Sequence, residues 1–115
     1  AGALSATLYS EPSFPPSLVR ARVRFVNSTM DVAALDVFVN FSLQVSGLPM
    51  NAISAGIELD ADAIAGTAYE FDFKASGSSQ VGLQLPGVVL FGGQLYTIYV
   101  VGPGSALAGV VVQDN

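Results

Sequence analysis

From residue 19 onward, apolar and polar residues alternate with a period of two, which is typical of β-strands with one buried face. In the first such stretch, Val19 to Phe25, the apolar side chains share one face and three arginines share the other. Similar alternations follow at residues 36–41, 57–60 and 69–74, and largely apolar stretches of strand length follow at residues 87–91, 95–101 and 107–113. Glycine and proline separate most of them, and helical periodicity is almost absent; residues 51–66 are ambiguous and are interpreted as strand and loop.

Each of these strands has an apolar face that a second sheet must cover. The sequence therefore predicts an all-β fold, an antiparallel β-sandwich of about seven strands. The 115 residues suffice for one domain with a single core. Only 11% of the residues are charged, against roughly 25% in a typical soluble domain. This shortage of charge indicates that another molecule covers part of the surface, and self-association is the first candidate.

The composition also argues against several classes of function. A net charge of -5 gives no electrostatic reason to bind nucleic acid or an anionic membrane. Without cysteine or histidine, the chain lacks the usual zinc ligands, thiol nucleophiles and the commonest acid–base side chain. Residues 75–113 carry no charge, but glycine and proline divide them into lengths too short for a membrane-spanning helix. We therefore expect no enzyme, no cofactor and no membrane span.

The first eighteen residues differ from the rest, so we divide the chain into residues 1–18 and a sandwich domain of residues 19–115. Residues 10–17 are rich in proline and serine, which predicts an extended linker. Before this linker, Leu4, Ala6 and Leu8 alternate with polar or amphipathic residues over Ala3–Tyr9. This spare strand would either fold back as an edge strand or add to the sheet of a neighbouring subunit.

Three stretches resemble one known family. The sequence RVRFVNSTMDVAALDVFVN, residues 22–40, is similar to the start of the domain-of-unknown-function family 4397, which typically runs R-V-R-V-V-N-A-S-P-D-A-P-A-V-D-V-Y-V-N-G. The later GGQLYTIYVVG resembles that family's A-G-x-x-Y-T-V-x-V-x-G, and VVVQDN resembles its closing strand. The resemblance covers residues 19–115. It implies an immunoglobulin-like sandwich on a secreted or envelope-exposed microbial protein, and no known catalytic residues.

The chain departs from the family pattern at several positions. Met30 and Ala33 stand where the family favours proline, and Phe41 stands where a hairpin glycine is usual. We therefore expect the hairpin after Asn40 to be longer than the family's tight turn, with Phe41 buried.

Two short segments each place a glycine three residues before a tyrosine at the start of a strand. The pairs are Gly66 with Tyr69 and Gly93 with Tyr96. In immunoglobulin-like domains a tyrosine in such a corner bonds through its hydroxyl to nearby backbone. Tyr96 is the better candidate for this role; the alternative is that both are ordinary core aromatics.

Several acidic residues are candidates for a site. Asp31 and Asp36 could form a carboxylate pair or ligate calcium, but we favour a role in accepting backbone N–H bonds at a turn and a strand start. Glu58, Asp60 and Asp62 would share one face of a strand and could bind calcium.

The favoured alternative is electrostatic. A basic stripe, Arg20, Arg22 and Arg24, would match the acidic residues of neighbouring strands, with Glu70 and Asp72 as a second acidic stripe. Such stripes would help to select strand neighbours and register without forming a site.

Two triplets, starting at Asn27 and Asn40, match the acceptor pattern for N-glycosylation, although such triplets often arise by chance. Serine and threonine are plentiful, but without histidine there is no usual base to activate one. Exposed tyrosines such as Tyr9 or Tyr99 could stack on a sugar.

We therefore predict an extracellular structural subunit, secreted or on the cell surface, whose signal peptide has already been removed. Its N-terminal strand, with Leu4, Ala6 and Leu8 at the subunit interface, would add to an adjacent copy of the chain. Repeated head to tail, this contact forms a filament. The alternative is a monomeric cell-surface adhesin or carbohydrate-binding module with a glycan as its partner.

Overall fold

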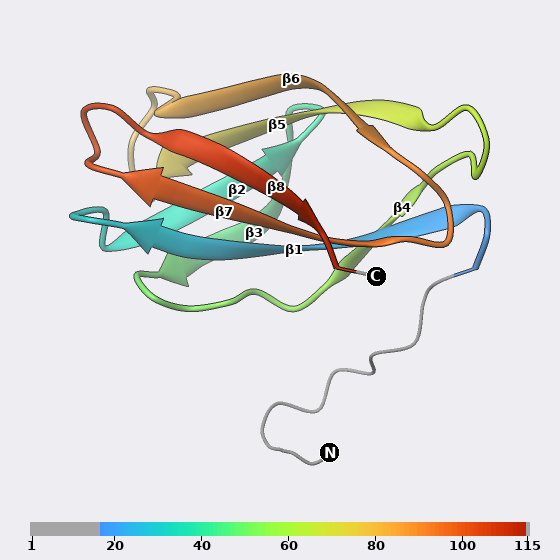
Figure 1. Ribbon diagram of the computed structural model, residues 1–115. Helices are drawn as coiled ribbons and strands as arrows, with labels where there is room; N and C mark the ends of the chain where they lie inside the picture. Colours follow the sequence, from blue (N-terminus) through green and yellow to red (C-terminus); the bar gives the residue numbers. More distant parts are fainter. Residues whose placement is uncertain (1–16, 115) are drawn as a thin grey trace, which may run out of the picture.

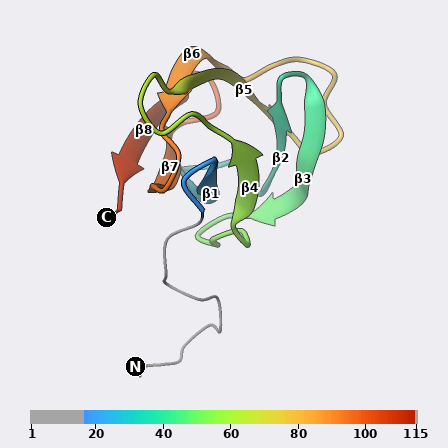
Figure 2. The ribbon, with the colours of Figure 1, turned by 90° about the vertical axis from the view of Figure 1, so that its right-hand side faces the viewer.

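The computed structural model describes residues 17–114, which form eight strands in two sheets of four (Figure 1). The strands are β1 (Arg20–Thr29), β2 (Ala34–Val39), β3 (Ser42–Pro49), β4 (Ile57–Asp60), β5 (Thr67–Ala75), β6 (Leu83–Leu90), β7 (Leu95–Gly102) and β8 (Ala108–Gln113). One sheet has the order β4-β1-β7-β8, and the other has the order β3-β2-β5-β6. The two sheets stack as two layers, so the prediction of an all-β sandwich is confirmed (Figure 2).

The sheets differ from the sequence prediction in two respects. There are eight strands rather than about seven because β3 was not predicted: Gly47 and Pro49 interrupt its pattern, and most of its side chains are exposed. In addition, β1 and β7 run parallel, with Arg22 opposite Leu95, so the first sheet is not antiparallel throughout.

The core lies between the layers and is centred on three fully buried phenylalanines. The ring centroid of Phe25 in β1 lies 5.8 Å from that of Phe71 and 6.0 Å from that of Phe73, both in β5. Tilted and edge-on ring pairs of this kind stabilise a core beyond the burial of their area. Among the described residues, buried apolar side chains come from every strand except β4 and β8.

The hairpin between β2 and β3 contradicts the sequence prediction. Val39 pairs with Ser42, so the loop contains only Asn40 and Phe41, whose φ angles are 48° and 69°. Two consecutive positive φ angles are typical of a type I′ turn, the tight turn whose twist suits a hairpin. Phe41 is 71% exposed, so the expectations of a longer loop and a buried phenylalanine are both wrong.

The chain enters β1 at a defined place. Gly92 packs directly against the backbone of Leu18, because a Cβ atom on Gly92 would overlap the carbonyl oxygen of Leu18. The backbone N–H of Gly93 then donates to the carbonyl oxygen of Arg20 at 2.8 Å. The N-terminal strand and most of its linker, predicted for residues 1–16, lie outside the described residues.

Candidate functional site

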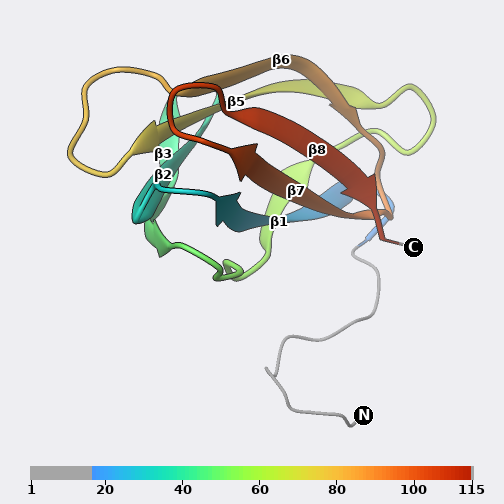
Figure 3. The same ribbon diagram turned by 60° about the vertical axis from the view of Figure 1, so that its left-hand side comes forward.

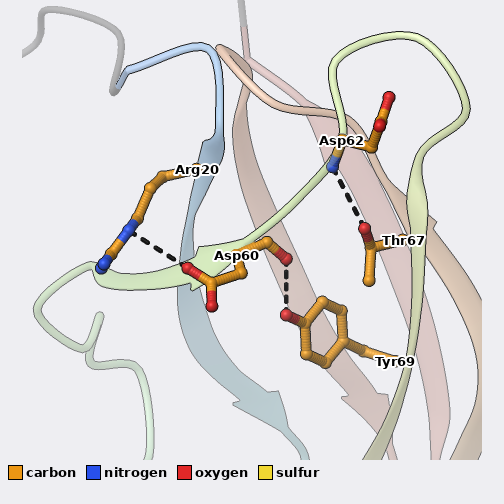
Figure 4. Close-up of polar contacts among 5 residues, drawn as sticks. All are labelled: Arg20, Asp60, Asp62, Thr67 and Tyr69. Carbon is orange, nitrogen blue, oxygen red and sulfur yellow. Dashed lines mark hydrogen bonds and ion pairs between the residues drawn. The ribbon is translucent and has the colours of Figure 1, made fainter.

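The charged residues of β1 and β4 form two ion pairs on the outward face of the first sheet. Arg22 lies 2.9 Å from a carboxylate oxygen of Glu58, and Arg20 lies 3.2 Å from one of Asp60 (Figure 4). The Cα register places the same residues opposite each other. This confirms the predicted match between the basic stripe and the acidic residues of β4. Arg20 and Asp60 form an exposed pair, whereas Arg22 is largely covered; cross-strand pairs of this kind contribute about 0.2–1 kcal/mol each and favour this register over a shifted one.

The rest of the predicted stripes is arranged differently. Glu70 and Asp72 lie on the outward face of the other sheet, because Phe71 and Phe73 between and beside them point into the core. They therefore do not face the arginines. Arg24 instead donates from Nε to the hydroxyl of Thr97 at 3.1 Å.

The acidic residues proposed for calcium do not converge. Glu58 and Asp60 form ion pairs, and β4 ends at Asp60, so Asp62 does not continue their face. The backbone N–H groups of Ala65 and Ile64 donate to the Asp62 carboxylate at 2.9 and 2.8 Å, which lowers the pKa of Asp62. The carboxylates of Asp60 and Asp62 point away from each other (Figure 4). Within residues 17–114, no group of three histidine, cysteine, aspartate or glutamate residues is arranged to hold a metal ion.

A shallow depression lies beside these residues. It is lined by Val19, Arg20, Asp60, Ala61, Asp62 and Thr67. Polar groups in and beside the depression form hydrogen bonds with one another. The N–H of Asp62 donates to the Thr67 hydroxyl at 3.1 Å, and the hydroxyl of nearby Tyr69 donates to the carbonyl oxygen of Asp60 at 2.5 Å. Burial, and then the charge of Asp60, raise the pKa of Tyr69. These groups stabilise the loop between β4 and β5, and they do not converge on a space for a ligand.

The two aspartates of residues 31 and 36 accept backbone N–H bonds, as predicted, but their partners are distant in sequence. Asp31 accepts the N–H of Gly104 at 2.6 Å and so ties the β1–β2 turn to the β7–β8 loop. Asp36 lies within β2, where it accepts the N–H of Gly47 at 2.8 Å and the hydroxyl of Ser76 at 2.7 Å. The bond from Ser76, followed by that from Gly47, lowers the pKa of Asp36. Neither aspartate forms a carboxylate pair with another acidic residue of the described part of the chain.

The most unusual carboxylate is Asp72, which the sequence did not distinguish from its neighbours. Asp72 is only 4% exposed although it faces outward from the sheet, and its Oδ1 atom has no hydrogen-bond partner among residues 17–114. Its cross-strand neighbours are Phe38 of β2 and Gln84 of β6. Burial, a hydrogen bond with Glu70 and the charge of Glu70 together raise the pKa of Asp72. The surroundings of Asp72 therefore disfavour its ionised form, although the charge of Lys74 offsets part of this effect.

The two candidate glycosylation sites have opposite surroundings. The Asn27 side chain is fully buried, and its Nδ2 donates to the carbonyl oxygens of Val32 and Leu48 at 3.1 and 3.0 Å. Its Oδ1 accepts from the Thr29 hydroxyl at 2.7 Å, so this fold leaves no room for a glycan on Asn27. Asn40 is exposed in the type I′ turn, and glycosylation there stays a prediction.

Both tyrosines of the repeated glycine–tyrosine pattern bond back to upstream backbone. The hydroxyl of Tyr96 accepts the N–H of Phe91 at 2.9 Å, which is the corner geometry expected for it. The hydroxyl of Tyr69 reaches the Asp60 carbonyl in the same way. Both residues therefore have structural roles.

Exposed large apolar residues lie both in loops, where Met30 and Ile64 are the most exposed, and on the edge strands β3, β6 and β8. Val110, Val111 and Val112 of β8 are 47%, 41% and 38% exposed, and Leu43 of β3 is 50% exposed. The predicted interface residues Leu4, Ala6 and Leu8 lie outside the described residues. Sequence reasoning predicted a strand at β8 but not its place at an edge, since strand order depends on contacts distant in the sequence.

No family model matches the chain, and no curated protein matches it, so the resemblance to family 4397 stays a prediction. A solved structure is similar to the fold described above. It is the C-terminal domain of AlgF from P. aeruginosa. The two chains are 20% identical, with a TM-score of 0.61, and the similarity covers 84% of this chain and 99% of the AlgF domain. At this identity the likeness to AlgF supports the fold alone. The described part of the chain contains no helix that could span a membrane.

Proposed function

We propose that this chain is an extracellular, non-catalytic structural subunit that assembles by donating its N-terminal strand, Ala3–Tyr9, to a neighbouring copy. Backbone hydrogen bonds supply the affinity of such a contact, and alternate side chains supply the specificity. Leu4, Ala6 and Leu8 are the side chains that pack against the acceptor.

The observation that carries this proposal is the contrast between a filled core and an apolar exterior. Within residues 17–114 the core already contains three packed phenylalanines and side chains from both sheets. At the same time, large apolar residues at strand edges remain exposed in a chain with few charges. An exposed apolar edge on a sheet is a ready template for another strand.

A donor at one place on the molecule and an acceptor at another make a head-to-tail contact. Such a contact repeats from copy to copy and gives an open filament unless the rotation closes a ring. The resemblance to a secreted or envelope-exposed family supports an extracellular location for this assembly.

The test compares three forms of the protein by light scattering: wild type, a deletion of residues 1–12, and the full chain with Leu4→Asp and Leu8→Asp. The proposal predicts that the wild type assembles and that both altered forms remain monomeric with unchanged melting temperatures. Ser5→Asp with Thr7→Asp places the same charges on the opposite face and is expected to assemble.

A deletion variant that forms the same assemblies would contradict strand donation. A wild-type protein that stays monomeric when concentrated would favour the alternative, a monomeric adhesin or carbohydrate-binding module. In that case Tyr99, on the outward face of β7, is the aromatic residue to test for sugar binding.

A further inference from the structure

The sandwich has four strand edges, and three of them carry features that hinder the addition of another strand. β4 has only four residues and carries the charges of Glu58 and Asp60. β3 contains Pro49 and two register shifts against β2. β6 contains Pro86 and a register shift against β5. Short length, charge, proline and bulges are the means by which proteins protect their edges.

The fourth edge, β8, has none of these protections. Its sequence AGVVVQ contains no charge and no proline, and its register against β7 is regular over all six residues. Among residues 17–114 no strand pairs with its outer side, which faces away from β7 (Figure 3). Three consecutive half-exposed valines on an unprotected edge indicate a surface that accepts a strand.

The backbone of β8 is oriented for this pairing. The N–H of Asp114 donates to the carbonyl oxygen of Leu95 at 2.7 Å. Asp114 and Leu95 are therefore a hydrogen-bonded pair of the antiparallel β7–β8 ladder. Because such pairs alternate along antiparallel strands, Val112 and Val110 also direct their backbone groups to β7. Gly109 and Val111 therefore direct their N–H and carbonyl groups toward the open edge.

The inward-facing apolar side chains beside this edge are incompletely covered. Val111 pairs with the buried Ile98 and so points to the inner side of the sheet, yet it is 41% exposed. Leu83 and Leu85 of β6, in the opposite layer, are only partly buried. Leu85 leans over Gly109, where a Cβ atom would lie 2.6 Å from Leu85 Cδ1. A strand added to β8 would continue the inner layer and cover these side chains.

We propose that the open edge of β8 is the acceptor for the N-terminal strand of a second copy of the chain. The inference rests on the proposed function and names its acceptor. The donor strand Ala3–Tyr9 has seven residues and β8 has six, so the two are similar in length. In the antiparallel register that sets Leu4–Tyr9 against residues 108–113, Ala6 lies opposite Val111. Leu4, Ala6 and Leu8 then point inward toward the β6 leucines, while the alternate residues face outward.

The direction of the chain favours a neighbour's β8 over the chain's own. β1 begins at the end of the sheet where β8 finishes, because Arg22 pairs with Leu95 and Leu95 adjoins Asp114 (Figure 1). A segment that returns from β1 by the shortest route would therefore run parallel to its own β8. An antiparallel pair, which is the more stable arrangement, would require the linker to cross the full length of β8 first. A neighbour's edge imposes no such constraint.

The first experiment substitutes proline at two edges of the full chain. Val111→Pro removes an N–H that faces the open edge while leaving the β7–β8 ladder intact. Leu43→Pro is the matched control at the β3 edge, where the tight hairpin makes the N–H of residue 43 also face outward. The expected result is loss of assembly for Val111→Pro and wild-type assembly for Leu43→Pro, with both melting temperatures near the wild-type value.

If Val111→Pro still assembles while deletion of residues 1–12 abolishes assembly, the β8 acceptor is wrong and strand donation stands. If the deletion variant assembles too, the proposed function itself fails. Loss of assembly in Leu43→Pro alone would move the acceptor to β3.

Cross-linking tests the same contact even if the proline variant does not fold. The chain contains no cysteine, so Ala6→Cys protein mixed with Val111→Cys protein can form only introduced disulfides. The proposal predicts a covalent heterodimer under mild oxidation, and a Ser5→Cys control is expected to cross-link far less because its side chain faces the other side. A double Ala6→Cys, Val111→Cys chain that closes within one molecule, with no heterodimer in the mixture, would assign the segment to its own β8 and overturn the inference.

Discussion

Replacing Asp72 by asparagine tests the cost of burying this carboxylate, because the substitution is expected to stabilise the protein. Asp72 is 4% exposed and its Oδ1 has no hydrogen-bond partner among residues 17–114, so burial disfavours an ionised carboxylate there more than the charge of Lys74 favours it. Asparagine has nearly the same shape, carries no charge, and offers an amide donor to neighbouring Glu70. Asparagine leaves the buried oxygen without a donor but removes the charge, and each unit by which the folded-state pKa is raised corresponds to about 1.4 kcal/mol, so Asp72→Asn should stabilise by roughly this order at neutral pH. For a domain of this size, each kcal/mol raises the melting temperature by about 4–8 °C.

The sign of the pH dependence follows from the raised pKa of Asp72. The folded state holds the proton more tightly than the unfolded state, so the native protein is favoured below the ordinary value of 3.8. Stability is then lost as the pH rises from 3.8 through the folded-state pKa. Asp72→Asn removes this loss, so the variant should exceed the wild type increasingly as the pH rises through this window.

Asp36→Asn is the matched control on the same outward face, and its effect on stability is expected to change with pH in the opposite direction. Its pKa is lowered by Ser76 and Gly47, so its contribution is present above 3.8 and is lost as the pH falls through the folded-state pKa. Melting temperatures between about pH 3 and pH 7 distinguish the two variants. A lower melting temperature for Asp72→Asn at neutral pH, or a difference from wild type that does not change with pH, would refute the reasoning.

Three further substitutions test the fold by urea unfolding. Phe41→Gly should stabilise the protein by about 1 kcal/mol, because glycine adopts the left-handed conformation of this position without steric strain. Phe41→Ala keeps a Cβ atom and therefore the strain, so it should give no such gain. Asn27→Ala should destabilise the protein by about 1–3 kcal/mol, because the carbonyl groups of Val32 and Leu48 lose the buried amide donor of Asn27. An unchanged free energy of unfolding would contradict a stabilising role for these two hydrogen bonds. Arg22→Ala should cost about 0.2–1 kcal/mol, and adding Glu58→Gln should cost little more if the ion pair is the cause.

Local sequence pattern was sufficient to predict most strands and one strand pair. The alternation of Arg20 and Arg22 with apolar residues, set against that of Glu58 and Asp60, indicated both the outward faces and their complementary charges. The prediction succeeded because period-two patterning fixes which side chains share a face, and opposite charges on neighbouring strands then restrict the register.

The failures have a common physical cause, which is dependence on contacts distant in the sequence or on backbone angles. Asp31 bonds to Gly104 across two loops, and nothing near Asp31 indicates that partner. The left-handed angle at Phe41 is set by the need to close a two-residue hairpin, although phenylalanine does not favour it. Asp72 shares its strand pattern with Glu70, and only the packing around it removes it from water.

The valine run of β8 shows both effects: its local sequence predicts a strand, but contacts distant in the sequence place that strand at an edge. In sequence, a continuous apolar run is typical of a strand buried on both faces, and nothing in residues 108–113 indicates otherwise. In the sandwich the same run occupies an edge, where Val111 is 41% exposed. Such an edge on a monomer promotes uncontrolled association, and the three other edges carry proline, charge or bulges that oppose it. Among the four edges formed by residues 17–114, β8 alone lacks these protections, and the proposed donation of residues 3–9 by a second copy would supply the strand that covers it.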